Sequence, residues 1–573
     1  MDGFRTPGGG LLPDWSIERL SRDAATVQLA AGEWLFHERD AAESAFVVRS
    51  GRLEVLSEPD GLPIRIVKRG AMIGELALLT RTDRSASVRA LCDSELLEID
   101  RAAFERMLGD DGALAVSLCG VLAAQVAANR SPPAVHEPAR TIALIALDKG
   151  VSVDALAERL GRSLAPYGRA AVVSARDVSG PAVSVAAEAA TLVERALGGN
   201  RWVIMSAKDD PAAAWTRACL SEADRVVALS TGLVPRPWLT DASVLRGCEL
   251  LVIGRSAPDF LLRALEPAVV QVLVDDPAIE RYLGLAARRL TGRAVGIVLS
   301  GGGARAFAHI GVVEELRAAG VRIDRFGGAS VGALIAAAYA MELTNDSALD
   351  AIRHYFVEEK PNSDYTLPVY AVLRGRRAQR LLAEGFGPVR IEELPTRFFA
   401  VSTDLTTRSL VVHRSGPVHE AVFASLAVPG MFPPVPAAHG RLLVDGGVLD
   451  NLPVQTMAQD AEGPVIAVDV GQVTGWVPAR RGPEARWRAG VRTLIAGRAD
   501  RLPTLTETLL RTMMIGSRDT VAAARRHADL VITPEVAGAG LVEFKQLSRM
   551  REAGRAAVRR LLESDPEALA PFL

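Results

Sequence analysis

Three consecutive glycines interrupt the chain at residues 301–303, within the run LSGGGARAFAHIG. The run follows an apolar segment typical of a strand and enters a segment typical of a helix. It therefore predicts a tight strand-to-helix turn, where glycine frees the backbone from steric limits. Free N–H groups at a helix N-terminus favour negative charge. The same letters match G-x-G-x-x-A (Gly301, Gly303, Ala306), the dinucleotide-binding fingerprint. The turn thus predicts a cradle either for a nucleotide pyrophosphate or for a transient oxyanion.

The size and composition of the chain indicate a multidomain globular protein. Its 573 residues exceed what one hydrophobic core supports and predict about three to four domains. Hydrophobic residues make up 49% and charged residues 23%, while a net charge of −2 gives no nucleic-acid signature, so we expect no nucleic-acid partner. Basic residues that are mostly arginine, with many alanines, suggest a bacterial origin.

Neither the cysteines nor the N-terminus indicates a metal centre or export. The cysteines lack metal-ligand spacing, so we expect reduced core thiols, no metal site and a cytoplasmic location (Cys92, Cys119, Cys219, Cys248). The N-terminal run MDGFRTPGGGLLPDW lacks the basic and apolar regions of a signal peptide. The apolar window 326–343 begins with glycines and Ser330, which favours a buried helix over a membrane span.

The first half of the chain predicts two domains joined by a linker. In residues 1–128, short alternating strands broken by glycine turns predict a small β-roll with helices, closed by a helical stretch over residues 101–128. Residues 129–139 are polar and proline-rich, which predicts the linker. Residues 140–290 alternate apolar strands with helices and predict a Rossmann-like α/β linker domain with a parallel sheet. That segment has no G-x-x-x-x-G-K-[ST] motif and no set of residues typical of catalysis.

Residues 291–573 are again α/β in pattern and contain a second notable turn. The run GGASVGALIAAAYA places G-x-S-x-G at residues 328–332 between a short strand and a helix, the setting that a nucleophile elbow requires. Small neighbours allow a sharp turn, which presents the Ser330 hydroxyl at the N-terminus of the following helix. Because the motif alone is weak, the alternative is an ordinary turn with a capping serine.

A serine hydroxyl attacks an ester only when a neighbouring base takes its proton. In the run GRLLVDGGVLDNLPV, Asp445 ends an apolar strand and precedes two glycines, so it is a candidate for this base. The alternative is an Asx-type turn after a strand. Asn451 and Pro453 are predicted to shape the turn that carries Asp445.

The three motifs resemble those of the patatin-like phospholipase family, G-G-G-x-[RK]-G, G-x-S-x-G and D-G-[AG], in the same order. They stand here at residues 301–306, 328–332 and 445–447, with Ala306 in place of the last glycine. A positive φ at Ala306 would strain the loop, whereas a helical φ would not. The resemblance implies a three-layer α/β domain and a Ser330–Asp445 dyad that requires no cofactor. It also implies an oxyanion hole of backbone N–H groups with an arginine beside them (Gly302, Gly303, Ala304, Arg305).

A Ser–His–Asp triad is the alternative to the dyad. In the chain order Ser, Asp, His, only His527 follows Asp445, and it lies between a basic helix end and a strand, where a cation at a helix C-terminus explains it. His309, just after the glycine loop, is predicted to be a packed helix residue.

The run GELALLTRTDRSASV at residues 74–88 resembles the phosphate-binding cassette of cyclic-nucleotide-binding domains. Glu75 is placed to accept a ribose hydroxyl, and Arg84 to pair with the cyclic phosphate, since guanidinium matches phosphate geometry. The full predicted site also includes backbone groups of the cassette (Gly74, Glu75, Leu76, Arg84, Ser85, Ala86). We expect cAMP or cGMP as a regulator; the alternative is a domain that persists as a protein-interaction module.

The combination of a cyclic-nucleotide-binding domain, an α/β linker domain and a patatin-like domain is similar to the neuropathy target esterase group of lysophospholipases. This resemblance implies hydrolysis of fatty-acyl esters of (lyso)phospholipids. Animal members carry a membrane anchor and several nucleotide-binding domains. This chain shows one such domain and no anchor, so we expect a cytoplasmic protein with transient contact with the inner membrane surface, and leave a homo-oligomer open.

Two other functions remain as alternatives. The first is a cyclic-nucleotide-responsive scaffold whose hydrolase fold is idle. The second is a nucleotide-dependent oxidoreductase, in which Asp324 would contact the ribose, although this reading assigns no role to Ser330 and Asp445. Two arginine-rich runs suggest either solvated surface or contact with anionic lipid (residues 374–380, with Arg374, Arg376, Arg377 and Arg380; residues 479–488).

Overall fold

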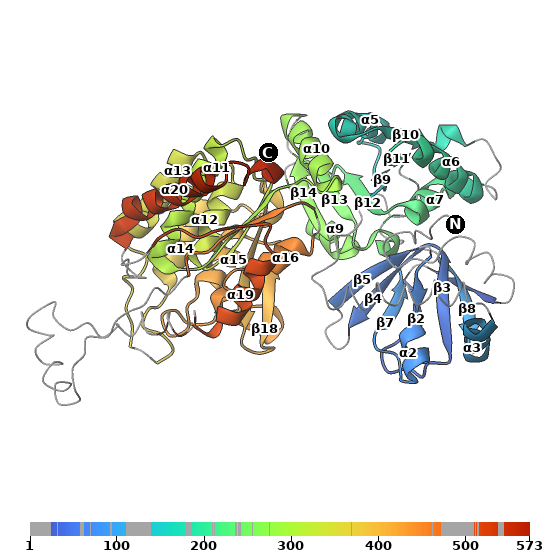
Figure 1. The fold of residues 1–573 in the computed structure, drawn as a ribbon, viewed down its shortest axis with the longest axis horizontal. Helices are drawn as coiled ribbons and strands as arrows, with labels where there is room; N and C mark the ends of the chain where they lie inside the picture. The colour runs from blue at the N-terminus through green and yellow to red at the C-terminus, as the bar shows by residue number, and fades with distance from the viewer. Residues whose placement is uncertain are drawn as a thin grey trace, which may run out of the picture. The chain divides into compact units, whose positions relative to one another are not determined.

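The computed structural model divides into two compact units, Met1–Thr291 and Gly292–Leu573, each described by itself (Figure 1). The structure describes residues 24–573 apart from residues 31, 58–61, 69, 92–93, 111–138, 179–184, 209, 211, 235–237, 239–241, 255, 274–275, 368, 461, 472–508, 510–511, 513–514 and 537–543. Residues 129–138 of the predicted linker 129–139 and residues 111–128 of the predicted helical stretch 101–128 lie outside these residues, as do Cys92, Cys119 and the arginine-rich run 479–488. In the described part of the chain, none of the helices combines the length and apolar character that crossing a membrane requires.

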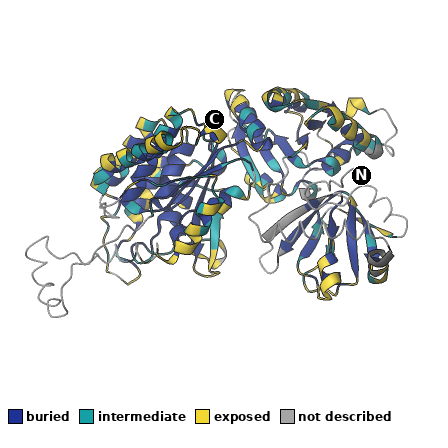
Figure 2. Cartoon of the chain, viewed as in Figure 1, coloured by how far each residue is buried: buried dark blue, intermediate teal, exposed yellow. Residues whose placement is uncertain are grey.

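The N-terminal part folds as the predicted β-roll. One antiparallel sheet has the order β1 (Ala25–Leu29), β8 (Ser94–Asp100), β3 (Ser44–Ser50) and β6 (Met72–Ile73). The second has the order β2 (Trp34–Phe36), β7 (Ser87–Ala90), β4 (Arg52–Ser57) and β5 (Leu62–Lys68). Within the described residues, helices α2 (Glu75–Thr80) and α3 (Arg101–Asp110) accompany the sheets. Small apolar cores on these strands, which include Val47 and Val55, hold the roll together (Figure 2).

The second part is a doubly wound parallel sheet. Its strands have the order β10 (Ala170–Ser174), β11 (Trp202–Ala207), β9 (Thr141–Ala146), β12 (Arg225–Ser230), β13 (Glu249–Ile253) and β14 (Val269–Leu273). One face packs against α5 (Val153–Leu164) and α10 (Asp276–Leu290), and the other against α6 (Val185–Gly199), α7 (Ala214–Glu222) and α9 (Asp259–Leu265). Cys219 and Cys248 are buried free thiols.

The strand order leaves one detail of the sequence analysis unconfirmed. A Rossmann sheet has the order 3-2-1-4-5-6, whereas here the third strand of the domain, β11, lies between the first, β9, and the second, β10. The α/β fold with a parallel sheet is confirmed, and the Rossmann-like assignment is not. Local hydrophobic patterns predict strands but leave the order of neighbouring crossovers open.

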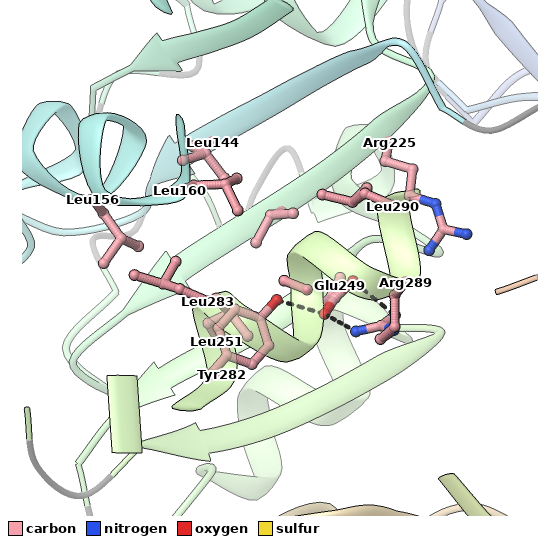
Figure 3. Close-up of a pocket in the computed structure, with 12 residues that line it drawn as sticks. Leu144, Leu156, Leu160, Arg225, Glu249, Leu251, Tyr282, Leu283, Arg289 and Leu290 are labelled. Atoms are coloured by element: carbon pink, nitrogen blue, oxygen red, sulfur yellow. Dashed lines mark hydrogen bonds and ion pairs between the residues drawn. The ribbon is translucent and has the colours of Figure 1, made fainter. Parts of the chain in front are cut away.

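A small pocket in this domain encloses a buried ion pair rather than a reactive centre (Figure 3). Arg289 donates to both carboxylate oxygens of Glu249 at 2.7 and 3.1 Å, and Tyr282 Oη donates to Oε1 at 2.6 Å. Burial raises the pKa of Glu249, but the charge and hydrogen bonds of Arg289 outweigh it and leave that pKa lowered. Arg289 and Tyr282 thus occupy the carboxylate oxygens of Glu249.

The C-terminal unit has a mixed sheet of eight strands between two layers of helices. The order is β19 (Val435–Pro436), β20 (Leu442–Asp445), β17 (Arg397–Asp404), β16 (Arg325–Ala329), β15 (Gly296–Leu299), β21 (Val465–Val468) and β22 (Leu530–Ile532), with β18 (Ser409–His413) paired to β17. Helices α11 (Ala308–Ala318), α12 (Val331–Ala340) and α20 (Leu547–Ser564) pack on the face that Ile297 and Leu299 enter. Helices α16 (Val454–Ala458) and α19 (Arg518–His527) pack on the face that Val298 enters. Every residue of α12 is buried, as predicted for this apolar window (Figure 2).

Candidate active site

Ser330 and Asp445 come together because the strands before them end against the same edge of β17. Strand β16 runs parallel to β17 with Ala329 opposite Val401, and β20 runs antiparallel to it with Asp445 opposite Ser402. Strand β18 pairs with the same stretch of β17, so β16 and β20 share the other edge. The C-terminal ends of β16 and β20 therefore meet at adjacent positions along β17.

The backbone at Ser330 has the strained geometry expected of a nucleophile elbow. Its φ of 54° and ψ of −132° lie outside the regions that non-glycine residues normally adopt. Gly328 and Gly332 permit the turn, because Cβ atoms there would lie 2.7 and 2.3 Å from the Leu299 carbonyl oxygen. The N–H of Ser330 donates to Ser425 Oγ at 2.9 Å. The serine side chain makes no capping hydrogen bond to α12, which disfavours the capping-serine interpretation.

The hydroxyl of Ser330 points instead at Asp445. Ser330 Oγ donates to Asp445 Oδ2 at 2.6 Å, and both residues are buried. Asp445 Oδ1 accepts from the N–H of Gly447 at 2.8 Å, so the predicted Asx-type turn and the contact with serine exist together. Burial raises the pKa of Asp445 to about 7, although both hydrogen bonds lower it. A carboxyl group with this pKa, in contact with a hydroxyl, is suited to exchange a proton near neutral pH.

The glycine loop places unpaired donors beside this pair. Gly303 adopts φ 55° and opens the 3₁₀ helix Gly303–Phe307, in which Ala306 takes a helical conformation without strain. Among the described residues, the N–H groups of Gly302, Gly303 and Ala304 have no hydrogen-bond acceptor. The N–H of Arg305 donates to Gly302 O at 3.2 Å, so this backbone donor is already occupied, and the Arg305 side chain is buried. Free N–H groups in a loop of this kind are the chemistry that an oxyanion requires.

Asn451 connects the glycine loop to the turn that follows Asp445. Its Nδ2 donates to Gly301 O at 3.1 Å, and the N–H of Gly301 donates back to Asn451 O at 3.2 Å. A Cβ at Gly301 would lie 2.4 Å from Asn451 Oδ1 and 3.0 Å from Ser330 Cβ, so the glycine is required by close approach. Asn451 therefore holds the glycine loop in place, in addition to its predicted role of shaping the turn that carries Asp445.

An apolar pocket opens beside Ser330 and Gly303. Phe356 stacks on Phe544 with centroids 4.6 Å apart, and Phe423 meets Phe432 edge to face at 5.7 Å. Aliphatic side chains form much of the remaining lining (Val331, Leu426, Val428, Met431). A lining of this kind suits a hydrocarbon chain.

The two candidate histidines lie apart from this chemistry. His309 is fully buried with Nε2 2.8 Å from Ser300 O, and burial lowers its pKa to about 4, as expected of a packed neutral side chain. His527 is the last residue of α19, and the described structure records no hydrogen bond from it to Ser330 or Asp445. In the same part of the chain, no group of three metal-binding side chains comes together.

The predicted cyclic-nucleotide cassette turns at Gly74, which has φ 79° and precedes α2. Glu75 and Arg84 are both buried. Arg84 donates to Ser44 O at 2.8 Å and to Gly74 O at 3.2 Å, and its guanidinium lies 4.1 Å from the ring centroid of Phe36. Arg84 Nε is buried without a partner in the described residues. A buried, unsatisfied cationic donor fits an anionic ligand such as a cyclic phosphate. Leu76 lies in the first turn of α2, and Ser85 and Ala86 form the bend that leads into β7.

Sequence reasoning missed the residues that support the site from far along the chain. Ser425, which accepts from the N–H of Ser330, lies in α15 (Val418–Leu426), 95 residues away. The aromatic wall of the pocket combines Phe356, Phe423 and Phe544 from separate segments. None of these residues stands in a motif, so no local signal in the sequence identifies them.

Comparison with known proteins assigns the chain to a family. Residues 297–458 match the patatin-like phospholipase family, and residues 26–111 match the cyclic nucleotide-binding domain. An uncharacterized NTE family protein of Mycobacterium tuberculosis is 34% identical over 570 residues, covering 97% of this chain and 96% of that protein. The lysophospholipase NTE1 of Cryptococcus neoformans is 27% identical, covering 79% of this chain and 33% of that protein. The neuropathy target esterase of Drosophila melanogaster is 26% identical, covering 77% and 36%.

The match to the mycobacterial protein extends over nearly the whole of both chains. It includes the cyclic-nucleotide-binding segment and the patatin segment in their order along the chain. The chain therefore belongs to the NTE family and carries the patatin-like phospholipase domain of that family in its C-terminal unit.

Proposed function

We propose that the chain hydrolyses the fatty-acyl ester bond of lysophospholipids and phospholipids through an acyl-Ser330 intermediate, with Asp445 as the base. Family membership makes it a lipid-ester hydrolase, and the proposal adds the substrate class and the reacting residues. The observation that carries it is the 2.6 Å hydrogen bond from Ser330 Oγ to the buried Asp445 Oδ2, beside an apolar pocket.

In the first half-reaction, Ser330 Oγ attacks the carbonyl carbon of the ester while its proton passes to Asp445 Oδ2. The carbonyl π electrons move to oxygen, and we assign the N–H groups of the glycine loop as donors to this oxyanion (Gly302, Gly303, Ala304), with the side chain of Arg305 beside them. When the oxyanion collapses, the bond to the glycerol oxygen breaks, and that oxygen takes the proton from Asp445. The acyl chain is then esterified to Ser330.

In the second half-reaction, water attacks the acyl carbonyl carbon while Asp445 takes its proton. Collapse of this second oxyanion breaks the bond to Ser330 Oγ, which regains the proton, and the fatty acid leaves. One carboxyl group thus serves as base and then as acid in both halves, because its pKa of about 7 leaves either form accessible near neutral pH.

The test is fatty-acid release from lysophosphatidylcholine by the full chain and by three variants. We expect Ser330→Ala and Asp445→Asn each to reduce release to background, because one removes the nucleophile and the other the base. Asp324→Asn tests the dinucleotide alternative, in which Asp324 would contact the ribose. Unchanged release by both dyad variants would end the proposal, and no release by the parent chain would favour the idle scaffold.

We further propose that the N-terminal roll binds cAMP or cGMP as a regulator, with Glu75 and Arg84 contacting the ribose and the phosphate. The family match of residues 26–111 and the unpartnered Arg84 Nε support this. Calorimetry on the full chain should detect binding of one of the two nucleotides, and Arg84→Gln should weaken it. Absence of heat with both would contradict the proposal.

Because the proposed substrates are membrane lipids, we also propose that the protein is cytoplasmic and contacts the inner membrane transiently. Whether the chain forms a homo-oligomer stays an open prediction.

A further inference from the structure

A hairpin-like loop of residues 364–374, of which all but residue 368 are described, lies next to the acyl pocket; we call it the tip loop. Its base is closed by a bridge between Tyr365 and Leu373 and by the hydrogen bond from Arg374 N to Asp364 O at 2.9 Å. Thr366 N donates to Val372 O at 2.9 Å, one step closer to the tip. These bonds define a narrow base from which the intervening residues extend.

The tip loop exposes apolar side chains to an unusual degree. Leu367 is 81%, Val369 75% and Tyr370 83% exposed, and Tyr365 is 69% exposed. Among the described residues, four of the most exposed large hydrophobic side chains thus stand within six consecutive positions. Single exposed hydrophobic residues are ordinary, but a contiguous group of this kind marks an interaction surface.

The loop is anchored to the wall of the acyl pocket. Val372 N donates to Gly430 O at 2.9 Å and Leu373 N to Met431 O at 3.0 Å, and Met431 lines the pocket with Ser330. Pro361 and Asn362, which precede the loop, line the same pocket. Whatever the tip binds is therefore held close to the pocket that leads to Ser330.

Positive charge lies at the base of the tip loop. Arg374, Arg376 and Arg380 are exposed, and Arg376 begins helix α14 (Arg376–Phe386), whose first turn has no acidic residue. The helix dipole disfavours a cation at this N-terminus, so the dipole of α14 does not stabilise the charge of Arg376. Arg377 is held by Glu359, and Arg380 pairs with Glu384 at 3.6 Å. Among the described residues, the guanidinium groups of Arg374 and Arg376 have no recorded acidic partner and stay available to external anions.

We propose that the tip loop docks the C-terminal unit on a lipid bilayer containing anionic lipid, with Leu367, Val369 and Tyr370 entering the interface and Arg374 and Arg376 contacting phosphate groups. This inference rests on the proposed function, because it supplies the route by which a membrane lipid reaches Ser330. Tyrosine and aliphatic side chains suit the headgroup boundary, and adjacent arginines are attracted to an anionic surface.

A second copy of the chain is a poorer occupant for this surface. A symmetric dimer places the same patch of each subunit against the other, which would bring the arginines at the base of one tip loop towards the identical arginines of its partner. An anionic bilayer instead offers opposite charge around an apolar layer. Charge complementarity therefore favours the membrane.

The test uses the full chain with Ser330→Ala, so that the vesicles are not degraded. Sedimentation with vesicles of equal parts phosphatidylcholine and phosphatidylglycerol should show binding of this parent. Adding Leu367→Ser and Tyr370→Ser should lower the partition coefficient about 10–100-fold, from the apolar area lost. Adding Arg374→Gln and Arg376→Gln should lower it about fivefold per arginine on these vesicles, and much less on phosphatidylcholine alone.

The matched control adds Leu405→Ser and Leu442→Ser, two partly exposed leucines that do not line the pocket, and should bind like the parent. In chains with Ser330 intact, the tip variant should turn over a soluble short-chain ester normally while losing activity on vesicle-bound lysophospholipid. If no chain hydrolyses any ester, the proposed function fails, but the sedimentation result still decides the docking. Equal vesicle binding by parent and tip variant would overturn the inference. The inference would also be overturned if the parent did not bind vesicles but formed a self-associated species that the tip substitutions abolished.

Discussion

Acidification below neutral pH should switch the enzyme off through Asp445 alone. Burial raises the pKa of this carboxyl group to about 7, and only its ionised form can take the proton of Ser330. Below that pKa the ionised fraction falls tenfold per pH unit, so kcat/KM at about pH 5 should be roughly 100-fold below its plateau above neutral pH. The acid limb should have unit slope, since it reports one group.

The assay is kcat/KM on a soluble short-chain ester as a function of pH, which avoids changes in lipid aggregation. Asp450 supplies the control, because burial raises its pKa to about 6 and it lies on the turn that follows Asp445, yet it accepts from Leu452 N rather than from Ser330. Asp450→Asn should keep the acid limb. A profile that stays flat down to about pH 5, or a limb that Asp450→Asn removes, would refute the reasoning.

Three further outcomes follow from the site. The pKa of Asp445 in the folded chain lies above its unfolded value of 3.8, so the free energy of unfolding of the wild type falls as pH rises towards the folded pKa. The introduced asparagine does not titrate, so the free energy of unfolding of Asp445→Asn, relative to that of the wild type, should increase by about 3 kcal/mol from about pH 5 to about pH 8. Denaturant unfolding at the two pH values measures this difference. Gly301→Ala should lower kcat/KM about 10²-fold or more by displacing the donor loop, whereas Gly385→Ala, where a Cβ meets nothing within 4 Å, should leave it unchanged. Asn451→Ala should lower kcat about tenfold with KM and circular dichroism retained, because the loop loses the hydrogen bond that positions it; a KM effect alone would contradict this.

The parts of the fold that follow from local pattern were predictable. Glycine turns around short strands indicated the roll, and alternating strands and helices indicated the two α/β domains. The sharp turn at Ser330 follows from the small residues around it, because Gly328 and Gly332 leave room for the Leu299 carbonyl. The helical conformation at Ala306 explains why the glycine loop tolerates a departure from the family motif.

Contacts between distant segments were not predictable from one sequence. The order β10, β11, β9 depends on how crossovers pack, which local periodicity does not specify. The antiparallel course of β20 brings Asp445 to Ser330, and nothing in the run GRLLVDGG determines the direction of that strand. Ser425 carries no motif, although it holds the N–H of the proposed nucleophile.

The central claim is that Ser330, activated by Asp445, is the nucleophile. The most direct measurement is covalent labelling by an organophosphonate ester probe, located by peptide mass spectrometry. We predict a single labelled peptide that contains Ser330, no labelling of Ser330→Ala, and labelling of Asp445→Asn slowed by orders of magnitude. Labelling of another residue, or equally fast labelling of Ser330 in Asp445→Asn, would contradict the account.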